Sequence, residues 1–153
     1  MPVTMQQVRA VLDPEEPDYI QAAQLGSDAL PHIENLIKGA DPMLASKATY
    51  LASLIQDSRS ATVLKGATQS NYPEVRVAAA AGARNLASLA ASDVLESLLE
   101  DQDVGVRKVA LKSVPIDAPP VLRAKIQKLI ATDPENFVRD LSSRVFGRLR
   151  IMP

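Results

Sequence analysis

Apolar residues recur along this chain at a fixed spacing, and that spacing constrains the fold more than any other feature. Four of them stand 31 positions apart in consecutive copies: Ile33, Leu64, Leu95 and Ile126. Two more columns keep the same spacing: Leu36, Ala67, Leu98, Leu129 and Ile37, Thr68, Leu99, Ile130. In three of the four copies the columns supply apolar residues at i, i+3 and i+4, the stripe of a helix with one buried side. A period of this length predicts a stack of repeats in which each unit packs on its neighbours.

Helix-start signals mark the first helix of each unit. They are Asp41-Pro42, Tyr72-Pro73, Asp103-Val104 and Asp133-Pro134. A capping Asp accepts hydrogen bonds from the free N–H groups at a helix start, and Pro suits the first helical position. We therefore expect helices alone, at about 3–12, 17–26, 28–38, 42–56, 58–69, 73–89, 92–100, 104–114, 119–131 and 134–150. A column of small residues should let neighbouring first helices approach closely: Ala48, Ala79, Ala110 and Ser142.

Three segments share a loop Asp or Asn followed by Val-Arg: "PEVRVAAAAGARNLA", "EDQDVGVRKVALKSV" and "TDPENFVRDLSSRV". With them, residues 28–150 resemble HEAT-repeat proteins of the short bacterial type, related to the phycobilisome-lyase HEAT-like repeats. The resemblance implies an all-α fold, a right-handed α-solenoid of HEAT-like two-helix repeats. It also implies that the repeat arginines pair with aspartates of neighbouring inter-repeat loops. These arginines are Arg76, Arg107 and Arg139, and the candidate aspartates are Asp101, Asp103 and Asp133.

We predict a single HEAT-like repeat domain over residues 1–153. Residues 1–27 would form an N-terminal cap with an irregular first helix, 28–131 the regular repeats, and 132–153 a C-terminal half-repeat. The unit at 42–56 departs from the pattern because Leu44-Ala45 stands where the later units have Val-Arg.

The residue types that most chemistry needs are scarce. The chain has no cysteine, which excludes disulfides, iron–sulfur clusters and thiol chemistry. His32 is the only histidine, so we expect neither a multi-histidine metal site nor a Ser–His triad, and we interpret it as a partly buried or surface residue. We expect no enzyme, metal or cofactor. The apolar runs are shorter than the roughly 20 residues of a membrane span, and the N-terminus lacks a secretory h-region, which favours a cytoplasmic protein.

The second helices carry the predicted binding surface, because in a HEAT-like solenoid they line the concave side that partners occupy. If Ile33, Leu36 and Ile37 point inward, positions 31, 35 and 38 point outward, and so do their equivalents at steps of 31 residues. The nine candidate partner-binding residues are Asn35, Lys38, Lys65, Gln69, Asp93, Ser97, Glu100, Lys125 and Lys128. This mixed polar face predicts a non-catalytic protein–protein interaction module or scaffold. A bilin-lyase-like or chaperone-like accessory role is an alternative suggested by the resemblance alone.

The charges are unevenly spread along the chain. Residues 1–106 carry 7 Lys and Arg against 14 Asp and Glu, whereas residues 107–153 carry 10 against 4, so charges of −7 and +6 make up the net charge of −1. The basic end is sharpest at Arg144, Phe146, Arg148 and Arg150, which form a candidate anion-binding or C-terminal contact. A solvated basic face is the plainer interpretation. The other interpretations are contact with nucleic acid, with an acidic protein, or, through the C-terminal helix, with the acidic N-terminal half of a second copy of the chain.

Overall fold

The computed structural model describes residues 2–151, and every regular element in that range is a helix. The α-helices are α1 (Met5–Leu12), α2 (Tyr19–Ala22), α3 (Leu30–Ile37), α4 (Pro42–Leu54), α5 (Arg59–Ala67), α6 (Pro73–Gly82), α7 (Ser88–Leu98), α8 (Val104–Ser113), α9 (Pro120–Thr132) and α10 (Asn136–Arg148). Three short 3₁₀ turns accompany them: η1 (Ala23–Leu25), η2 (Ser27–Ala29) and η3 (Ala83–Asn85). The prediction of an all-α repeat fold is confirmed.

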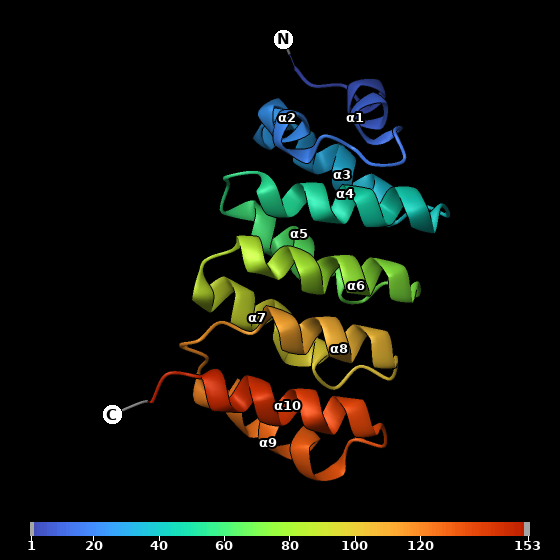
Figure 1. The fold of residues 1–153 in the computed structure, drawn as a ribbon. Coiled ribbons are helices and arrows are strands. Elements are labelled where there is room, and N and C mark those ends of the chain that lie inside the picture. Colours follow the sequence, from blue (N-terminus) through green and yellow to red (C-terminus); the bar gives the residue numbers. More distant parts are fainter. Residues whose placement is uncertain (1, 152–153) are drawn as a thin grey trace.

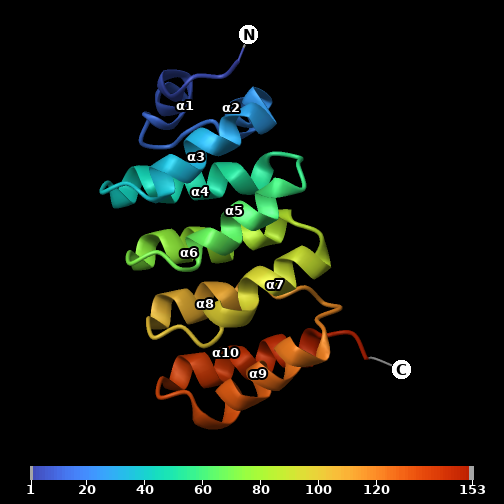
Figure 2. The ribbon, with the colours of Figure 1, turned by 180° about the vertical axis from the view of Figure 1, so that it is seen from behind.

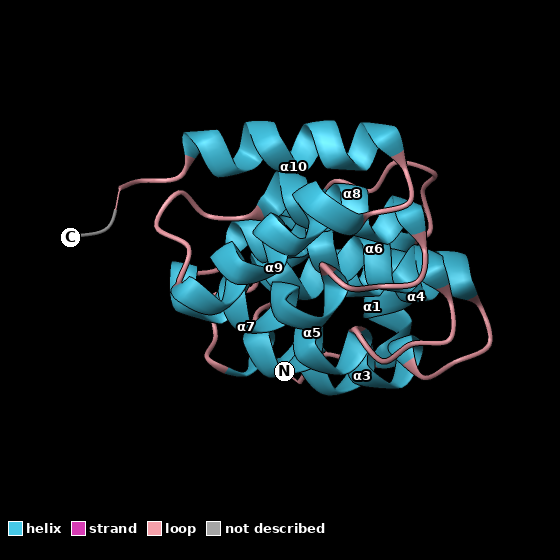
Figure 3. Ribbon diagram, turned by 90° about the horizontal axis from the view of Figure 1, so that it is seen from below, coloured by secondary structure: helices cyan, strands magenta, loops and turns pink. Residues whose placement is uncertain are grey.

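The helices stack in two layers. The first helices of the units, α4, α6, α8 and α10, lie side by side in one layer (Figure 1). The second helices, α3, α5, α7 and α9, form the other layer (Figure 2). Viewed along the stack, each helix is offset from the preceding one, and loops lie at the edges (Figure 3). We call these the first-helix layer and the second-helix layer.

The core lies between the two layers, where the sequence columns place it. Ile33, Leu64, Leu95 and Ile126 are fully buried, and so are all four members of the small-residue column. Helices α4 and α6 also approach closely at Gly82, where an added Cβ would lie 2.8 Å from the Cβ of Ser53. The small-residue column is buried as expected, between neighbouring first helices.

Three of the expected helices differ in the structure. The helix expected at 17–26 is the short α2 followed by η1, and the helix expected at 92–100 begins four residues earlier, at Ser88. The segment 73–89 is not a single helix, because α6 ends at Gly82, η3 follows, and Leu86 is extended before α7 starts at Ser88. Gly82 is the one helix-ending residue type near this boundary, because residues 83–91 contain no Pro or Gly. A tertiary contact also holds the turn: the Asn85 side-chain amide donates a hydrogen bond to Ser53 Oγ at 3.0 Å.

Candidate partner-binding site

The inter-repeat loops are tied together by buried ion pairs. Arg76 donates from Nε and Nη2 to the two carboxylate oxygens of Asp101, at 2.8 and 3.1 Å. Arg107 does the same to Asp133, at 2.7 and 3.2 Å. Both arginines are only 8% exposed. Paired forks of this kind fix the relative position of two groups as well as attracting them.

Main-chain carbonyls take the remaining hydrogen bonds of the two arginines. The Nη1 group of Arg76 donates to the Ser70 carbonyl at 2.8 Å, and that of Arg107 donates to the Asp101 carbonyl at 3.0 Å. We call the two ion pairs, Arg76–Asp101 and Arg107–Asp133, the Arg–Asp ladder. The ladder lies at the edge of the stack where one unit connects to the next. It confirms the pairing that the resemblance implies for Arg76 and Arg107.

The third arginine and the third candidate aspartate behave differently. Arg139 donates to the Asp133 carbonyl at 2.6 Å and to the Asn136 side chain, not to a carboxylate. Asp103 caps α8 by accepting a hydrogen bond from the Val106 N–H, so it is not a ladder residue.

The second-helix layer presents the nine predicted partner-binding residues, and the structure brings several of them together. Lys65 donates to the Asp93 carbonyl at 2.8 Å and lies 3.3 Å from its carboxylate. Lys125 lies 3.0 Å from the Glu100 carboxylate, and this hydrogen bond lowers the pKa of Glu100 below its ordinary value. The remaining five are exposed: Asn35, Lys38, Gln69, Ser97 and Lys128.

The two ion pairs reduce the net positive charge that the lysines of the second-helix layer present to solvent. Two cations of this layer are each matched to a carboxylate in a neighbouring unit, so those charges stabilise the stack and are partly neutralised before any partner arrives. Exposed pairs of this kind contribute little stability, at most about 1 kcal/mol. Binding by these nine residues stays a prediction.

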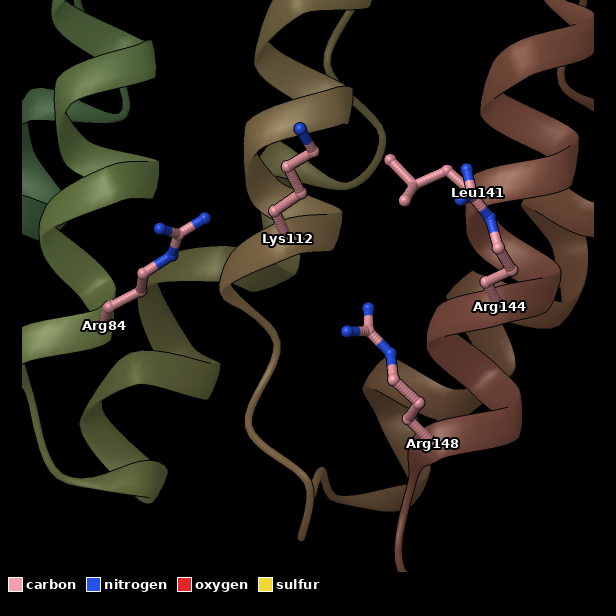
Figure 4. A pocket seen from close by; sticks show the side chains of 5 residues that line it. All are labelled: Arg84, Lys112, Leu141, Arg144 and Arg148. Atoms are coloured by element: carbon pink, nitrogen blue, oxygen red, sulfur yellow. The ribbon is translucent and has the colours of Figure 1, made fainter.

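The first-helix layer contains an open hollow of about 770 Å³ lined by Arg84, Lys112, Leu141, Arg144 and Arg148. We call it the basic hollow. Arg84 comes from η3, Lys112 from the last turn of α8, and the other three from α10, so three successive units contribute to it. Figure 4 shows the guanidinium groups of Arg84 and Arg148 reaching toward the α8 segment from opposite sides. The hollow lies at the C-terminal ends of the first helices, the edge opposite the ladder.

The cations of the basic hollow form no ion pair with residues 2–151. Arg84 donates from Nε to the Ser113 hydroxyl at 3.2 Å. Within residues 2–151, no carboxylate lies within 4.0 Å of a cationic group of Arg84, Lys112, Arg144 or Arg148. The helix C-termini beside Lys112 and Arg148 favour positive charge locally. Four like charges around one hollow nevertheless produce a positive potential that an anionic group would relieve.

Two of the four cations in the basic hollow were predicted from the sequence. Arg144 and Arg148 belong to the predicted anion-binding group and line the hollow. Phe146 and Arg150 do not line it: Phe146 is half-buried against the core, and the Arg150 backbone N–H donates to the Ile116 carbonyl at 2.7 Å. Lys112 and Arg84 were missed.

The repeat itself held the signal for Lys112. It stands five residues after the ladder arginine of its unit, and Arg144 stands five residues after Arg139, so the two occupy one column of neighbouring first helices. Arg84 has no such signal, because it enters through the irregular turn η3.

The single histidine contacts the N-terminal segment. His32 is partly buried, one of the two placements expected for it, and its Nε2 lies 2.8 Å from the Val3 carbonyl oxygen. Among the described residues, His, Asp and Glu side chains do not form a group of three that could hold a metal ion. Over the same range, the helices are too short or too polar to span a bilayer.

The chain was compared with known proteins. No family model matches the chain, and no curated protein matches it. Among solved structures, it is similar to a chain of the complex of CpcE and CpcF of phycocyanin lyase from Nostoc sp. PCC7120, with a TM-score of 0.71 and 22% sequence identity. The match covers 92% of this chain and 96% of that chain. The fold is a HEAT-like helical repeat. At this level of identity the similarity establishes the fold alone.

Proposed function

We propose that this HEAT-like repeat chain is a non-catalytic interaction module that binds an acidic segment of a protein partner in the basic hollow. The observation that carries the proposal is the convergence of four cations, from three successive units, on a hollow without a countercharge among residues 2–151. Arginine guanidinium groups suit carboxylates because their planar forks donate two parallel hydrogen bonds. The apolar side chain of Leu141 in the lining favours a peptide over a bare ion.

The scaffold is suited to this role. The buried Arg–Asp ladder at the opposite edge fixes how one unit sits on the next, so side chains from separate units keep constant spacing. A site assembled from several units needs that rigidity, because ordering loose elements on binding subtracts from affinity.

A second candidate function is a bilin-lyase-like accessory role. It is supported by the similarity to a phycocyanin lyase complex, in which CpcE and CpcF form a complex with each other, and by coverage of 96% of the matched chain. Such a role would also need a protein partner. Purified chain that carries a visible absorption band, or that copurifies with a pigment protein, would favour it over a general interaction role.

Affinity purification with surface variants tests the main proposal. The wild-type chain and two variants of equal charge change are used as baits in extract of the native host, and retained proteins are identified by mass spectrometry. One variant alters the hollow, Arg144→Glu with Arg148→Glu. The control alters exposed second-helix lysines, Lys38→Glu with Lys128→Glu.

The expected result is a partner retained by wild type and by the control and lost from the hollow variant. Loss from the control alone would move the binding surface to the predicted second-helix residues. Retention by both variants would contradict recognition at either surface. Circular dichroism melting curves of the three proteins establish that a loss of binding does not reflect unfolding.

A further inference from the structure

A second hollow lies on the same layer as the basic hollow and has the opposite chemistry. It has a volume of about 650 Å³ and lies among α2, α4 and α6. Its apolar lining includes Tyr19, Met43, Tyr50, Val77 and Ala78. We call it the apolar groove. Met43 is 67% exposed at the rim of the groove. The basic hollow does not include it, and exposed apolar side chains that gather at a groove often mark a binding surface.

The charged residues beside the apolar groove are arranged so that its floor stays apolar. The Lys47 ammonium donates to the carbonyls of Leu12 and Pro14, at 3.1 and 2.8 Å, so its charge is held at the loop after α1 while its stem lines the groove. Glu74 is exposed at the rim. A carboxylate there repels an acidic group and leaves the groove to an apolar one.

Helix α6 connects the two hollows. Val77 lines the apolar groove and Arg84, just beyond the end of α6, lines the basic hollow. Seven positions separate them, which corresponds to roughly 10 Å along a helix at about 1.5 Å per residue. Figure 1 shows α4, α6, α8 and α10 side by side, so a ligand crossing this layer meets both hollows.

We infer that the first-helix layer binds one partner segment at two points, with acidic residues in the basic hollow and one large apolar side chain in the apolar groove. The inference rests on the proposed function and defines the partner further. Val77 and Arg84 mark the facing sides of the two hollows, and most of the other lining residues come from α4, α8 and α10, so this separation is a minimum. An extended segment spans roughly 10 Å with about three residues, and a helical segment with about seven. The segment therefore carries acidic residues separated from a large apolar residue by at least one of these two spacings. The exposed Glu74 sets its direction, because the acidic end is favoured at the basic hollow alone.

Peptide selection on the full chain tests this inference. A phage-displayed library of random 12-residue peptides is selected on the wild-type protein, and the affinities of enriched peptides are measured by fluorescence polarisation. Four proteins are compared: wild type, the hollow variant Arg144→Glu with Arg148→Glu, the groove variant Met43→Asp, and the control Leu89→Asp. Leu89 is 83% exposed and lies on α7, so the control introduces the same charge at an exposed apolar residue of the other layer.

The expected peptides combine acidic residues with a large apolar residue at the stated spacing or a longer one. Their affinity should fall with both the hollow variant and the groove variant and stay unchanged with the control. Loss of one apolar anchor should weaken binding by roughly 10- to 100-fold, the effect of burying one large apolar side chain.

The outcomes separate the inference from the proposed function. Peptides sensitive to the hollow variant alone would leave the proposed function standing and overturn two-point binding. Peptides sensitive to neither variant, or an absence of enrichment, would overturn both. A wild-type chain that elutes as a dimer, and as a monomer after Met43→Asp, would overturn the inference as well, because a second copy would then occupy this layer.

Discussion

At the scale of single residues, Arg107 shows what the repeat arginine does. It is 8% exposed and joins the loop before α8 to the loop before α10 through the Asp133 carboxylate and the Asp101 carbonyl. Charges this deeply buried are stable only when their partners are present, because each charge has given up its hydration. The arginine therefore has a structural role, and its removal should lower the stability of the fold directly and not act through a binding site.

We predict that Arg107→Ala lowers the free energy of unfolding by about 3–5 kcal/mol, because it leaves the Asp133 carboxylate buried and unpaired. Urea denaturation monitored by circular dichroism measures the change. Arg59→Ala is the control, since Arg59 pairs with Asp57 in solvent, and its midpoint should match that of wild type. Equal losses in the two variants would show that burial of the pair does not matter.

The same residue positions explain how far the sequence could predict the ladder. The Val-Arg pattern located Arg76 and Arg107, and the family resemblance predicted that each pairs with an aspartate of a neighbouring loop. The unit at 42–56 lacks the signature because Ala45 takes the arginine's place, and Ser70 stands 25 residues later, the separation of Arg76 from Asp101. Both members of the pair are absent together, so neither is left as an unpaired buried charge.

Gly82 is a residue whose role the sequence does not reveal. We predict that Gly82→Ala destabilises the protein by about 1–3 kcal/mol, because the added methyl would lie 2.8 Å from the Ser53 Cβ and 3.2 Å from Leu64 Cδ2. Gly66→Ala is the matched control: it is also helical and its Cβ would meet nothing within 4 Å. That variant should be neutral or stabilising by up to about 1 kcal/mol. Thermal melting of both proteins distinguishes close packing from helix propensity.

At the scale of helices, α10 shows which boundaries and faces are readable from sequence. The spacing of Val138, Leu141 and Val145 predicts one buried stripe, and all three are buried. Two phenylalanines lie at the margins of this stripe. Phe137 is 47% exposed, whereas Phe146 is half-buried against the core. The sequence gives the direction of a stripe, but the depth of a marginal side chain depends on the neighbouring helices.

We predict that Phe146→Ser lowers the free energy of unfolding by about 1.5–3 kcal/mol, because it removes a large side chain that packs on the core. Phe137→Ser, at the exposed margin of the same helix, should have a smaller effect. Light scattering over a concentration series measures association in parallel. Association of the wild type that disappears in Phe146→Ser would support contact with a second copy through α10.

At the scale of the whole molecule, the uneven charge distribution becomes a distribution in space. The basic C-terminal residues gather on one edge of the first-helix layer, where Arg84 from the more acidic half of the sequence joins them. Sequence reasoning located the C-terminal half of this site and not the rest. Its complete form depends on how far each unit is offset from the last, which linear spacing does not specify.

We predict that duplex and single-stranded DNA bind no better than the non-specific range, about 10⁻⁴–10⁻⁶ M at physiological salt. The four cations form one local cluster and not a row that follows a phosphate backbone along the stack. Fluorescence polarisation with labelled oligonucleotides at several salt concentrations measures this. Tighter binding that the Arg144→Glu, Arg148→Glu variant abolishes would instead favour the nucleic-acid interpretation.

The Arg–Asp ladder stabilises one edge of the stack. The loops at the two edges therefore differ in how well they tolerate inserted residues. A residue inserted into the loops around Asp101 or Asp133 would pull a buried carboxylate away from its arginine. The segment between α8 and α9 follows the helix that carries Lys112 and belongs to the opposite edge. The Ile116 side chain in it is exposed, whereas Ala118 is buried, so the segment can lengthen most easily before Ile116. Lengthening a loop costs little free energy when no buried contact depends on it. Inherited insertions should therefore accumulate beside the basic hollow, where a lineage can acquire new partners while its scaffold stays intact.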